Sequence, residues 1–587
     1  MSHLSDTEAG DRFALPERMP GAPRLPGSSG QPGRLRHERH GVTAFGGLAE
    51  PGQSSAERIS RMTNLIPRGY PALVTKSPLP LYVKFGTSGP ATGLAVHRKK
   101  LVGFRGSTMF TTDIGGYAEY GTSTRRGQLT RTAKKFASFG EQLFIIPDLA
   151  VYDTTDDSLT PVLLDTGELE NVSIDYLHLV IPQGDLVKMG FRAGDCISLE
   201  VLDHSGTATP DGYYKLSAVT QTNLLVAGGF PVKGVFTVRI RRVMPDLEGI
   251  CAMGNRLYGF AGRTVYASEE GNPWNWYATR GLTEEKMPFS LTTDGEESFT
   301  ACTVWQGTPL FFKENGITRL SGRTGTVGKL IQADVAVLTE QSAPGVPLYY
   351  DEAICELDGV LYYSSGDRLY RYSGGLSTPV SQALPDGSAI RAIGTDGHVL
   401  YVSVRGADET NRLYLYDPEH GWYCLAKGYY TDLLKRPVEL ISGRGKVCLL
   451  QREDGAVFMA RSFGASPGAG MANSDDPLST SDAEVEFGDD TSLLPDGGRL
   501  LTVYVRANGQ SDSQMQVSVQ YDGGNWQTLA TLGGRGREYL YRVPVPPRPC
   551  QWFRLKLNFT GTGTPGAVSG LFRVYGLWWD TEPREAF

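Results

Sequence analysis

Between residues 90 and 462, one pattern of apolar and polar positions recurs along the chain. Each unit has an apolar strand, a turn of the type Asp-Gly, Gly-Asn or Gly-Lys, a strand of alternating aromatic and aliphatic residues, and a second turn that leads to a third strand. About seven such units are visible. They begin at Leu94, Phe136, Ile250, Cys302, Ile354, Ile393 and Glu439.

Short antiparallel strands repeated every ~40 to 50 residues are typical of β-propeller blades. One such sheet cannot bury both of its faces until neighbouring sheets pack around a central axis. The pattern therefore predicts an all-β fold whose main part is a β-propeller of about seven blade-like repeats. A β-sandwich or a β-helix array is the structural alternative, because the repeats are too divergent to fix the number of blades.

A long segment separates the second repeat from the third, between Leu163 and Val243. It contains the stretches IDYLHLVIP, GDCISLEVLD, GYYKLSAVTQTNLLVAGG and GVFTVRIRRV, which predict at least about five strands joined by turns. A segment of about 80 residues is long enough to have a core of its own. We therefore predict a small closed β-barrel, residues 163–243, inserted into the propeller.

The first 40 residues are rich in Pro, Gly and Arg and contain almost no large apolar side chain. Such a segment cannot build a core, so it is either a disordered terminus or an extended arm that becomes ordered along a neighbouring subunit. In the second interpretation, three arginines are the candidate subunit contacts: Arg34, Arg36 and Arg39.

The rest of the chain divides by composition. Residues 41–162 and 244–464 are assigned to the two parts of the propeller, and the small and polar residues 465–490 to a linker. Residues 491–587 alternate apolar and polar positions with a period of two, which predicts a C-terminal β-sandwich. Its tryptophans are expected in the core or at sheet edges rather than on a binding platform; they are Trp526, Trp552, Trp578 and Trp579.

Composition agrees with this fold class and excludes several functions. The 587 residues include 72 Gly and 35 Pro, which favours strands and turns over helices. A net charge of -7 without long runs of one sign excludes a general nucleic-acid binder. The seven cysteines stand singly, as in a reducing compartment. The polar N-terminus and the lack of long apolar runs predict synthesis in a cytosol without stable membrane insertion.

The sequence offers no clear catalytic, metal or cofactor site. The eight histidines form no metal-ligand pair, and neither a P-loop nor a nucleophile elbow is present. The acidic run at Asp153–Asp157 lacks the spacing of a calcium loop, so a solvated turn is expected there.

Carboxylates at the mouth of a propeller can hydrolyse glycosidic bonds, and Asp246, Glu314 and Asp351 lie at strand ends. The sequence selects no pair of them. SVQYDGGNW, from Ser518, lacks the register of a sialidase Asp-box, and a hairpin turn at Asp522 and Gly523 explains it. We therefore predict that the protein is not an enzyme.

Two stretches go beyond generic β-structure, Val243–Tyr277 and Phe299–Gly325. They resemble segments of tailed-bacteriophage tail nozzle, or head-to-tail stabilisation, proteins. The stretch from Arg61, RMTNLIPRGYPALVTKSP, resembles the beginning of the same family. The insert and the N-terminal arm have no counterpart in the resemblance. The matching segments are Asn255–Gly259, Ser268–Trp276, Phe312–Glu314, Leu361–Gly374 and Leu413–Trp422.

The resemblance implies a structural protein of a phage virion, assembled in the host cytoplasm. Copies of it would form a ring, typically hexameric, below the portal and adaptor proteins. The ring would extend the DNA channel, gate genome retention and ejection, and carry tail fibres or spikes. Double-stranded DNA would pass through without sequence-specific binding, for which a mildly acidic subunit is suited. The alternative is a carbohydrate-binding or glycan-hydrolysing β-propeller that acts as a receptor-binding tail protein.

Overall fold

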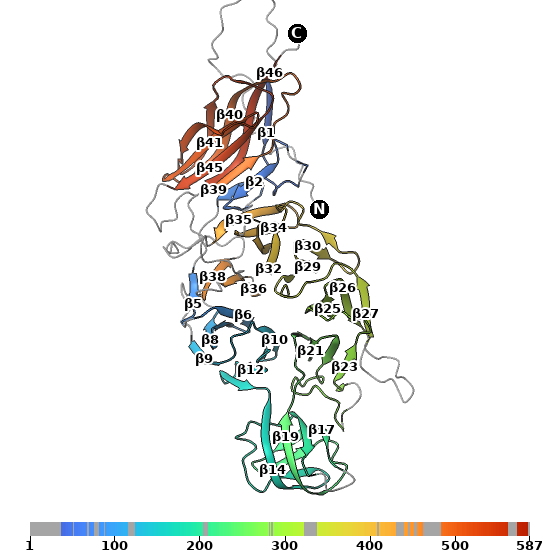
Figure 1. Ribbon diagram of the computed structural model, residues 1–587. Coiled ribbons are helices and arrows are strands. Elements are labelled where there is room, and N and C mark those ends of the chain that lie inside the picture. The colour runs from blue at the N-terminus through green and yellow to red at the C-terminus, as the bar shows by residue number, and fades with distance from the viewer. Residues whose placement is uncertain are drawn as a thin grey trace, which may run out of the picture.

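The computed structural model shows a protein of strands, turns and loops, and its described residues contain no α-helix and hence no helix that could cross a membrane. It describes residues 37–584 except 51, 54, 67–69, 76–80, 87–88, 115–123, 204–208, 281, 283–285, 322–336, 408–409, 430–438, 444–445, 451–454, 462–482 and 562–571. Three parts are visible in Figure 1: a sandwich, a ring of sheets and a barrel.

Seven sheets of four antiparallel strands make up the ring in the described part of the chain. Sheet 1 contains β6 (Ala91–His97), β7 (Lys100–Arg105), β8 (Thr108–Asp113) and β9 (Thr124–Gln128). Sheet 2 contains β10 (Lys135–Phe139), β11 (Gln142–Ile146), β12 (Ala150–Asp153) and β13 (Ser158–Pro161). Sheet 3 contains β20 (Gly249–Met253), β21 (Arg256–Ala261), β22 (Thr264–Ala267) and β23 (Phe289–Thr292).

The remaining sheets of the ring follow the barrel in the sequence. Sheet 4 contains β24 (Ala301–Trp305), β25 (Thr308–Lys313), β26 (Gly316–Ser321) and β27 (Val337–Ser342). Sheet 5 contains β28 (Ile354–Leu357), β29 (Val360–Ser364), β30 (Leu369–Tyr372) and β31 (Thr378–Pro379). Sheet 6 contains β32 (Ala389–Thr395), β33 (Leu400–Arg405), β34 (Asn411–Asp417) and β35 (Gly421–Tyr429). Sheet 7 contains β36 (Glu439–Gly443), β37 (Lys446–Leu450), β38 (Ala456–Arg461) and β5 (Leu81–Lys84).

The sheets stand around a common centre, as in a β-propeller (Figure 1). Their first strands face the centre, and β36 of the last sheet contacts β6 of the first. The second strands, such as β11 and β25, are buried along nearly their whole length because neighbouring sheets cover both faces. This explains why these strands are continuous apolar runs and do not alternate.

An N-terminal strand completes the last sheet. β5 pairs antiparallel with β38, with Val83 opposite Val457, and both valines are buried in one apolar cluster with Phe85. The ring is therefore closed by hydrogen bonds between segments more than 370 positions apart in the numbering, roughly the full length of the propeller. This closure prevents two free sheet edges from remaining at the ends of the repeat array.

The inserted barrel lies between sheets 2 and 3 in the sequence and projects from the ring (Figure 1). It is closed in the order β14-β15-β18-β17-β16-β19 around its own apolar core. The strands are β14 (Leu164–Ile174), β15 (His178–Val180), β16 (Cys196–Val201), β17 (Gly212–Val219), β18 (Asn223–Val226) and β19 (Gly234–Arg242). The small closed barrel predicted from the sequence is thus present.

The sandwich is made from both ends of the chain. One sheet joins β1 (Glu38–Val42), β3 (Leu65–Ile66) and β4 (Leu73–Thr75) to β40 (Gly498–Gly509), β43 (Glu538–Pro544), β44 (Pro549–Cys550) and β46 (Phe572–Pro583). The other has the order β2 (Ile59–Thr63), β39 (Ala483–Phe487), β45 (Phe553–Gly561), β41 (Ser513–Tyr521) and β42 (Gln527–Gly533).

The structure corrects two of the predicted boundaries. Residues 41–162 were assigned to the propeller, but β1 to β4 pair in the sandwich, where apolar residues of β1, β2 and β3 enter its core. The predicted linker 465–490 contains β39, whose alternation is strand-like and which pairs with β2 and β45. Composition could not show either pairing, because both partners are distant in the sequence. Residues 462–482 lie outside the described part.

The sandwich is joined to sheet 6 through the loop after β1. Gly47 N donates to His420 O at 2.6 Å, and Tyr423 OH donates to Phe45 O at 3.1 Å. A Cβ on Gly47 would stand 2.3 Å from the backbone N of Trp422, so this close approach requires glycine. One continuous apolar cluster runs from sheets 5 and 6 into the sandwich, which fixes the two parts together.

Sheets 1 and 2 are linked by a buried histidine. His97 Nδ1 lies 2.9 Å from Ser138 Oγ, and its Nε2 lies 3.0 Å from the carbonyl O of Glu141. A neutral ring satisfies both contacts if Nε2 donates to the carbonyl and Nδ1 accepts from the hydroxyl. Burial lowers the pKa of His97. The ring therefore stays neutral in the native protein at pH values at which the same histidine in an unfolded chain is already protonated.

We predict that Val83→Asp opens the ring. A carboxylate placed in the apolar contact between β5 and β38 should cost about 3 kcal/mol or more and lower the unfolding temperature by at least about 5 °C. Differential scanning calorimetry of the full chain measures this change. Lys84→Gln, on the exposed side of the same strand, is the control. Equal unfolding temperatures for the two variants would contradict the closing role of β5.

We also predict that His97 makes the fold sensitive to acid. Its pKa is lower in the native state than in the unfolded chain, so the unfolded chain binds the extra proton as the pH falls through about 6.5, and the free energy of unfolding decreases. Urea unfolding at about pH 7.5 and about pH 5 should show a larger loss for the wild type than for His97→Gln. The same loss in both proteins would show that His97 does not carry this sensitivity.

Candidate functional site

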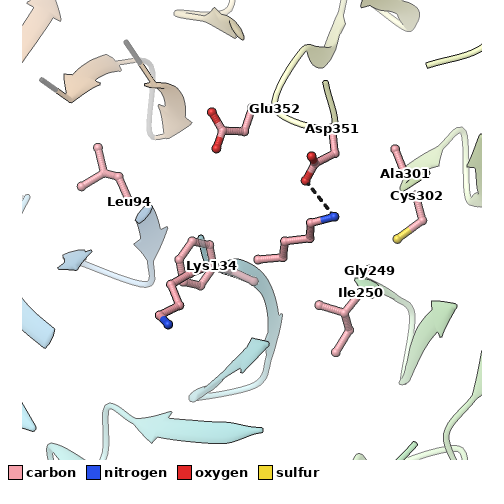
Figure 2. A pocket seen from close by; sticks show the side chains of 10 residues that line it. Leu94, Lys134, Gly249, Ile250, Ala301, Cys302, Asp351 and Glu352 are labelled. Atoms are coloured by element: carbon pink, nitrogen blue, oxygen red, sulfur yellow. Dashed lines mark ion pairs between the residues drawn. The ribbon is translucent and has the colours of Figure 1, made fainter. Parts of the chain in front are cut away.

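A cavity lies where the first strands of the ring converge (Figure 2). Its volume is ≈ 180 Å³, below the ~300 Å³ at which pockets for drug-sized ligands begin. Sheets 1 to 4 and the segment before β28 supply its wall. The lining residues are Leu94, Lys134, Lys135, Phe136, Gly249, Ile250, Ala301, Cys302, Asp351 and Glu352.

An ion pair crosses this cavity. Lys135 Nζ, from the start of β10, lies 3.2 Å from Asp351 Oδ2, and the dashed line at Asp351 in Figure 2 marks this ion pair. The neighbouring Lys134 is buried and bonds to Asp148 and, at 2.9 Å, to Thr130 O. The two lysines therefore neutralise the acids nearest to them, and the contacts tie sheet 2 to the segment before sheet 5.

The structure does not bring the three candidate acids together. Asp351 lines the cavity, whereas Asp246 is exposed in the segment that leaves the barrel and Glu314 is exposed in the turn between β25 and β26. Glycoside hydrolysis uses two carboxyl groups about 5 to 9.5 Å apart on either side of the bond. Among the residues that the structure describes, the only other acid in the cavity wall is Glu352, the next residue after Asp351. The cavity thus offers one neutralised carboxylate and its direct neighbour.

A second polar site lies where the barrel leaves the ring. Arg242, at the end of β19, is 1% exposed and pairs with Asp195 at 3.0 Å. Its guanidinium also donates to Val162 O and Pro161 O, both at 2.6 Å, and to Gly190 O at 3.1 Å. One side chain at the exit of the barrel therefore bonds to the segment that enters the barrel and to a loop of the barrel itself.

Trp274 and its neighbours complete this junction from sheet 3. The Arg242 guanidinium lies 4.7 Å from the centre of the Trp274 ring, a cation–π contact in a buried site. Asn272 Nδ2 donates to Gly194 O of the barrel at 2.6 Å. The buried Glu269 accepts from Asn272 and Asn275, each at 3.0 Å, and pairs with Lys215 of β17. The segment Ser268–Trp276, which resembles the phage family, therefore contacts the barrel and holds it against sheet 3.

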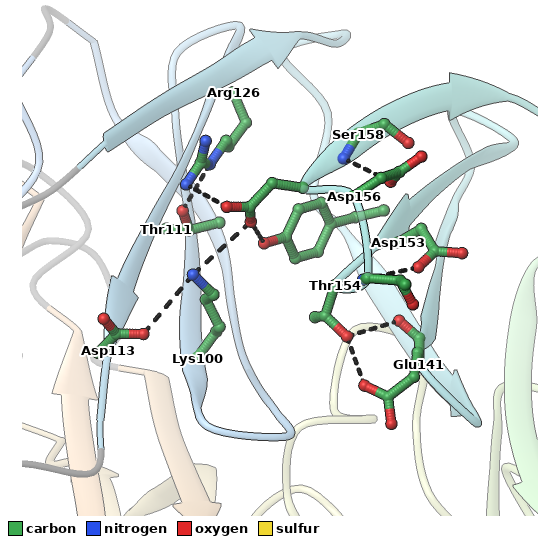
Figure 3. A network of polar contacts seen from close by, with 12 residues as sticks. Lys100, Thr111, Asp113, Arg126, Glu141, Asp153, Thr154, Asp156 and Ser158 are labelled. Atoms are coloured by element: carbon green, nitrogen blue, oxygen red, sulfur yellow. Dashed lines mark hydrogen bonds and ion pairs between the residues drawn. The ribbon is translucent and has the colours of Figure 1, made fainter.

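The acidic run 153–157 forms contacts within the protein (Figure 3). Asp157 accepts from Arg126 Nη2 at 2.9 Å and from Tyr152 OH at 2.5 Å, and Lys100 Nζ lies 3.6 Å from it. Arg126 and Lys100 belong to sheet 1, so Asp157 joins sheets 1 and 2. The hydrogen bond from Tyr152 lowers the pKa of Asp157. In the residues that the structure describes, no group of three His, Cys, Asp or Glu is placed to hold a metal.

Of the three candidate arginines, Arg39 is within the described residues and Arg34 and Arg36 are outside them. Arg39 lies on β1 and makes two hydrogen bonds to Asp580 of β46, at 2.7 and 3.1 Å, and its guanidinium lies 5.1 Å from the centre of the Tyr504 ring. Arg39 was expected in the N-terminal arm, residues 1–40, but it belongs to β1 of the sandwich. Its partners lie in the same chain, where it fastens the N-terminal strand to the sandwich.

The tryptophans of the sandwich divide into two kinds. Trp579 is buried and donates to Asp490, as expected for a core residue. Trp578 lies against Gly41, where a Cβ would stand 2.1 Å from the ring. Trp526 and Trp552 lie beside cationic side chains on the outward side of the five-stranded sheet. The turn predicted at Asp522 and Gly523 is present, with positive φ at both residues.

Sequence reasoning missed the junction residues Arg242 and Asp195. β19 did carry a signal. Side chains alternate between the two faces of a strand, so Arg242 points to the same side as the inward-facing Val238 and Ile240. A charged residue at an inward position needs a buried partner. The partner could not be found from the sequence, because Asp195 lies 47 positions earlier in the chain, in a loop.

We predict that Arg242→Met loosens the barrel. It leaves Asp195 buried without its partner, which costs about 3–5 kcal/mol, whereas Arg239→Met on the same strand removes an exposed pair with Asp165 worth at most about 1 kcal/mol. Hydrogen exchange of residues 164–242, followed by mass spectrometry, should show faster exchange only in Arg242→Met. Adding Asp195→Asn should restore part of the protection. Equal exchange in both single variants would refute the locking role.

No family model and no curated protein matches the chain. Among solved structures, Kluyveromyces lactis Hsv2 with one loop replaced by a Gly-Ser linker has 10% identity and a TM-score of 0.32, over 68% of this chain and 93% of that one. An exo-β-1,3-galactanase from Phanerochaete chrysosporium has 12% identity and a TM-score of 0.19, over 56% and 95%. PorZ of Porphyromonas gingivalis has 12% identity and a TM-score of 0.17, over 69% of this chain and 63% of that one. Scores this low assign neither blade number nor activity.

Proposed function

We propose that this chain is a structural protein of a tailed-bacteriophage virion. Copies of it assemble into a ring, expected to be hexameric, that serves as a tail nozzle or hub below the portal and adaptor proteins. The ring extends the DNA channel, gates genome retention and ejection, and anchors tail fibres or spikes. In this proposal the protein has no catalytic role and needs no cofactor.

The observation that carries the proposal is the place of the residues that resemble the phage family. Ser268–Trp276 supports the barrel, and Leu413–Trp422 runs from β34 into β35, where Trp422 contacts the loop that holds the sandwich. Leu361–Gly374 forms the buried middle strands of sheet 5. Two of these segments therefore lie at joints between parts of the molecule, as suits an assembly protein, and none of them lines the cavity.

We further propose that the seven four-stranded sheets are the seven blades of one propeller, with β5 as the last strand of the seventh. The centre of the propeller is then not the DNA path. The cavity of ≈ 180 Å³ is far too small for a duplex, and the pair of Lys135 and Asp351 spans it. The DNA channel of the proposed ring lies between subunits, on surfaces that the propeller, the barrel and the sandwich present together.

Stable subunit contacts of such a ring need about 2,000 Å² of buried surface or more, and the long sides of the three-part molecule offer surface for them.

The alternative, a glycan-hydrolysing propeller, would have its site at the cavity, where Asp351 and Glu352 are the available acids. The ion pair to Lys135 opposes this alternative, because it holds one carboxylate away from substrate.

Purified full-length protein tests the proposal. Light scattering should give the mass of a closed multimer, and negative-stain microscopy should show rings of uniform subunit number. A monomer or trimer that releases sugars from polysaccharides would overturn the proposal. Asp351→Asn separates the alternatives further: assembly should remain unchanged, whereas a glycosidase would lose its activity by about a thousandfold or more.

A further inference from the structure

One face of the sandwich combines polar side chains, paired charges and aromatic rings. The five-stranded sheet turns its apolar side chains, such as Val517 and Leu557, into the core. The opposite side of the same sheet faces away from that core. It carries amides, hydroxyls and paired charges in register, together with two tryptophans. We call this side the amide face, defined by the outward residues of β2, β39, β45, β41 and β42.

Two rows of polar side chains cross the amide face. Strand pairing places Glu484, Asn558, Gln516 and Thr531 side by side in one row. It places Arg61, Glu486, Lys556, Ser518 and Thr528 in the next, where Ser518 is buried. Neighbouring strands lie ~4.8 Å apart, so the polar side chains of each row follow one another at about this spacing.

The charges of the amide face balance. Lys556 Nζ lies 3.7 Å from both Glu484 and Glu486, and Arg61 lies 3.9 Å from each of them. Arg554 pairs with Asp489 beside them. Three cations therefore meet three carboxylates. A face without net charge, in which carboxylates stand among the cations, does not suit the phosphates of a nucleic acid.

Two tryptophans border these rows. Lys556 Nζ lies 4.4 Å from the centre of the Trp526 ring, and the Arg554 guanidinium lies 5.6 Å from that of Trp552. Because Lys556 and Arg554 point outward from β45, both indole rings belong to the amide face. Neither ring is fully buried. Flat aromatic rings next to polar groups can stack on the C–H faces of sugar rings.

The amide of Asn558 has hydrogen-bonding capacity left. Its Nδ2 makes one long contact, 3.5 Å to Gln516 Oε1, and its buried Oδ1 accepts no hydrogen bond. Most buried polar atoms in proteins have a partner. A rotation of the side chain would present this oxygen to a hydroxyl donor between β45 and β41, in the middle of the first row.

We propose that the amide face binds a neutral glycan chain. Amides, hydroxyls and carboxylates supply both donors and acceptors for sugar hydroxyls, and Trp526 and Trp552 supply stacking surfaces at one side of the rows. The binding involves no covalent step. This site lies in the sandwich, far in the fold from the cavity of the propeller, and it does not depend on the ring proposed above. It would give the protein a means of attachment to polysaccharide.

Affinity electrophoresis of the full chain tests the site. The native gel contains one neutral polysaccharide at a time: dextran, laminarin, galactomannan, xyloglucan or a neutral bacterial O-polysaccharide. At least one of them should retard the wild type, and Trp526→Ala and Trp552→Ala should each weaken this retardation about tenfold. Gln516→Ala, which removes only an amide, should weaken it as well and guards against loss of folding in the tryptophan variants.

Tyr575→Ala is the matched control. Tyr575 lies on β46 in the other sheet of the same sandwich, and the guanidinium groups of Arg506 and Arg573 lie 5.5 and 5.9 Å from its ring. This variant should bind as the wild type does. The proposal is overturned if no neutral polysaccharide retards the wild type, or if the three amide-face variants bind like the control. Retardation by heparin or duplex DNA alone would also overturn it.

Discussion

The fold depends on the pairing of strands from the two ends of the chain. A four-stranded sheet with two apolar faces is stable only when neighbours cover both, so a row of such sheets must close on itself. Closure occurs where β5 meets β38, and it is reinforced where β1 and β2 pair with β46 and β39 in the sandwich. The same crossing of the chain that closes the ring therefore also builds the second large part of the molecule.

The barrel depends on a different kind of contact. A closed barrel has no free edge with which to pair, so it cannot join the ring through backbone hydrogen bonds in a common sheet. Arg242, at the exit of the barrel, replaces them with side-chain bonds to the entering segment, and its guanidinium lies against the Trp274 ring. Buried charges of this kind add little net stability but are costly to break, which favours one defined orientation of the barrel. The three parts thus form one body whose joints are polar or densely packed.

The way in which the three parts are joined limits where a partner can bind. Where the first strands of the ring converge, Lys135 and Asp351 pair in the wall of a small cavity. Two of the segments that resemble the phage family, Ser268–Trp276 and Leu413–Trp422, lie at these joints. The surfaces that remain for partners lie on the outside, and among them the amide face combines balanced charge with aromatic rings. In the functions that we propose, the protein acts through assembly and attachment on its outer surfaces.

The sequence by itself determined the all-β class, the inserted barrel and the repeats, because a period of two and its turns are local properties that one strand carries alone. Each of the seven repeat units begins in the first strand of one sheet, from Leu94 in β6 to Glu439 in β36. Only the tertiary structure decided that β1 to β4 leave the propeller for the sandwich, that Arg39 binds Asp580 within the chain, and that Arg242 meets Asp195. These contacts join positions far apart along the chain. The pattern of each segment shows that it is a strand or carries a charge, but it does not show which distant segment it pairs with.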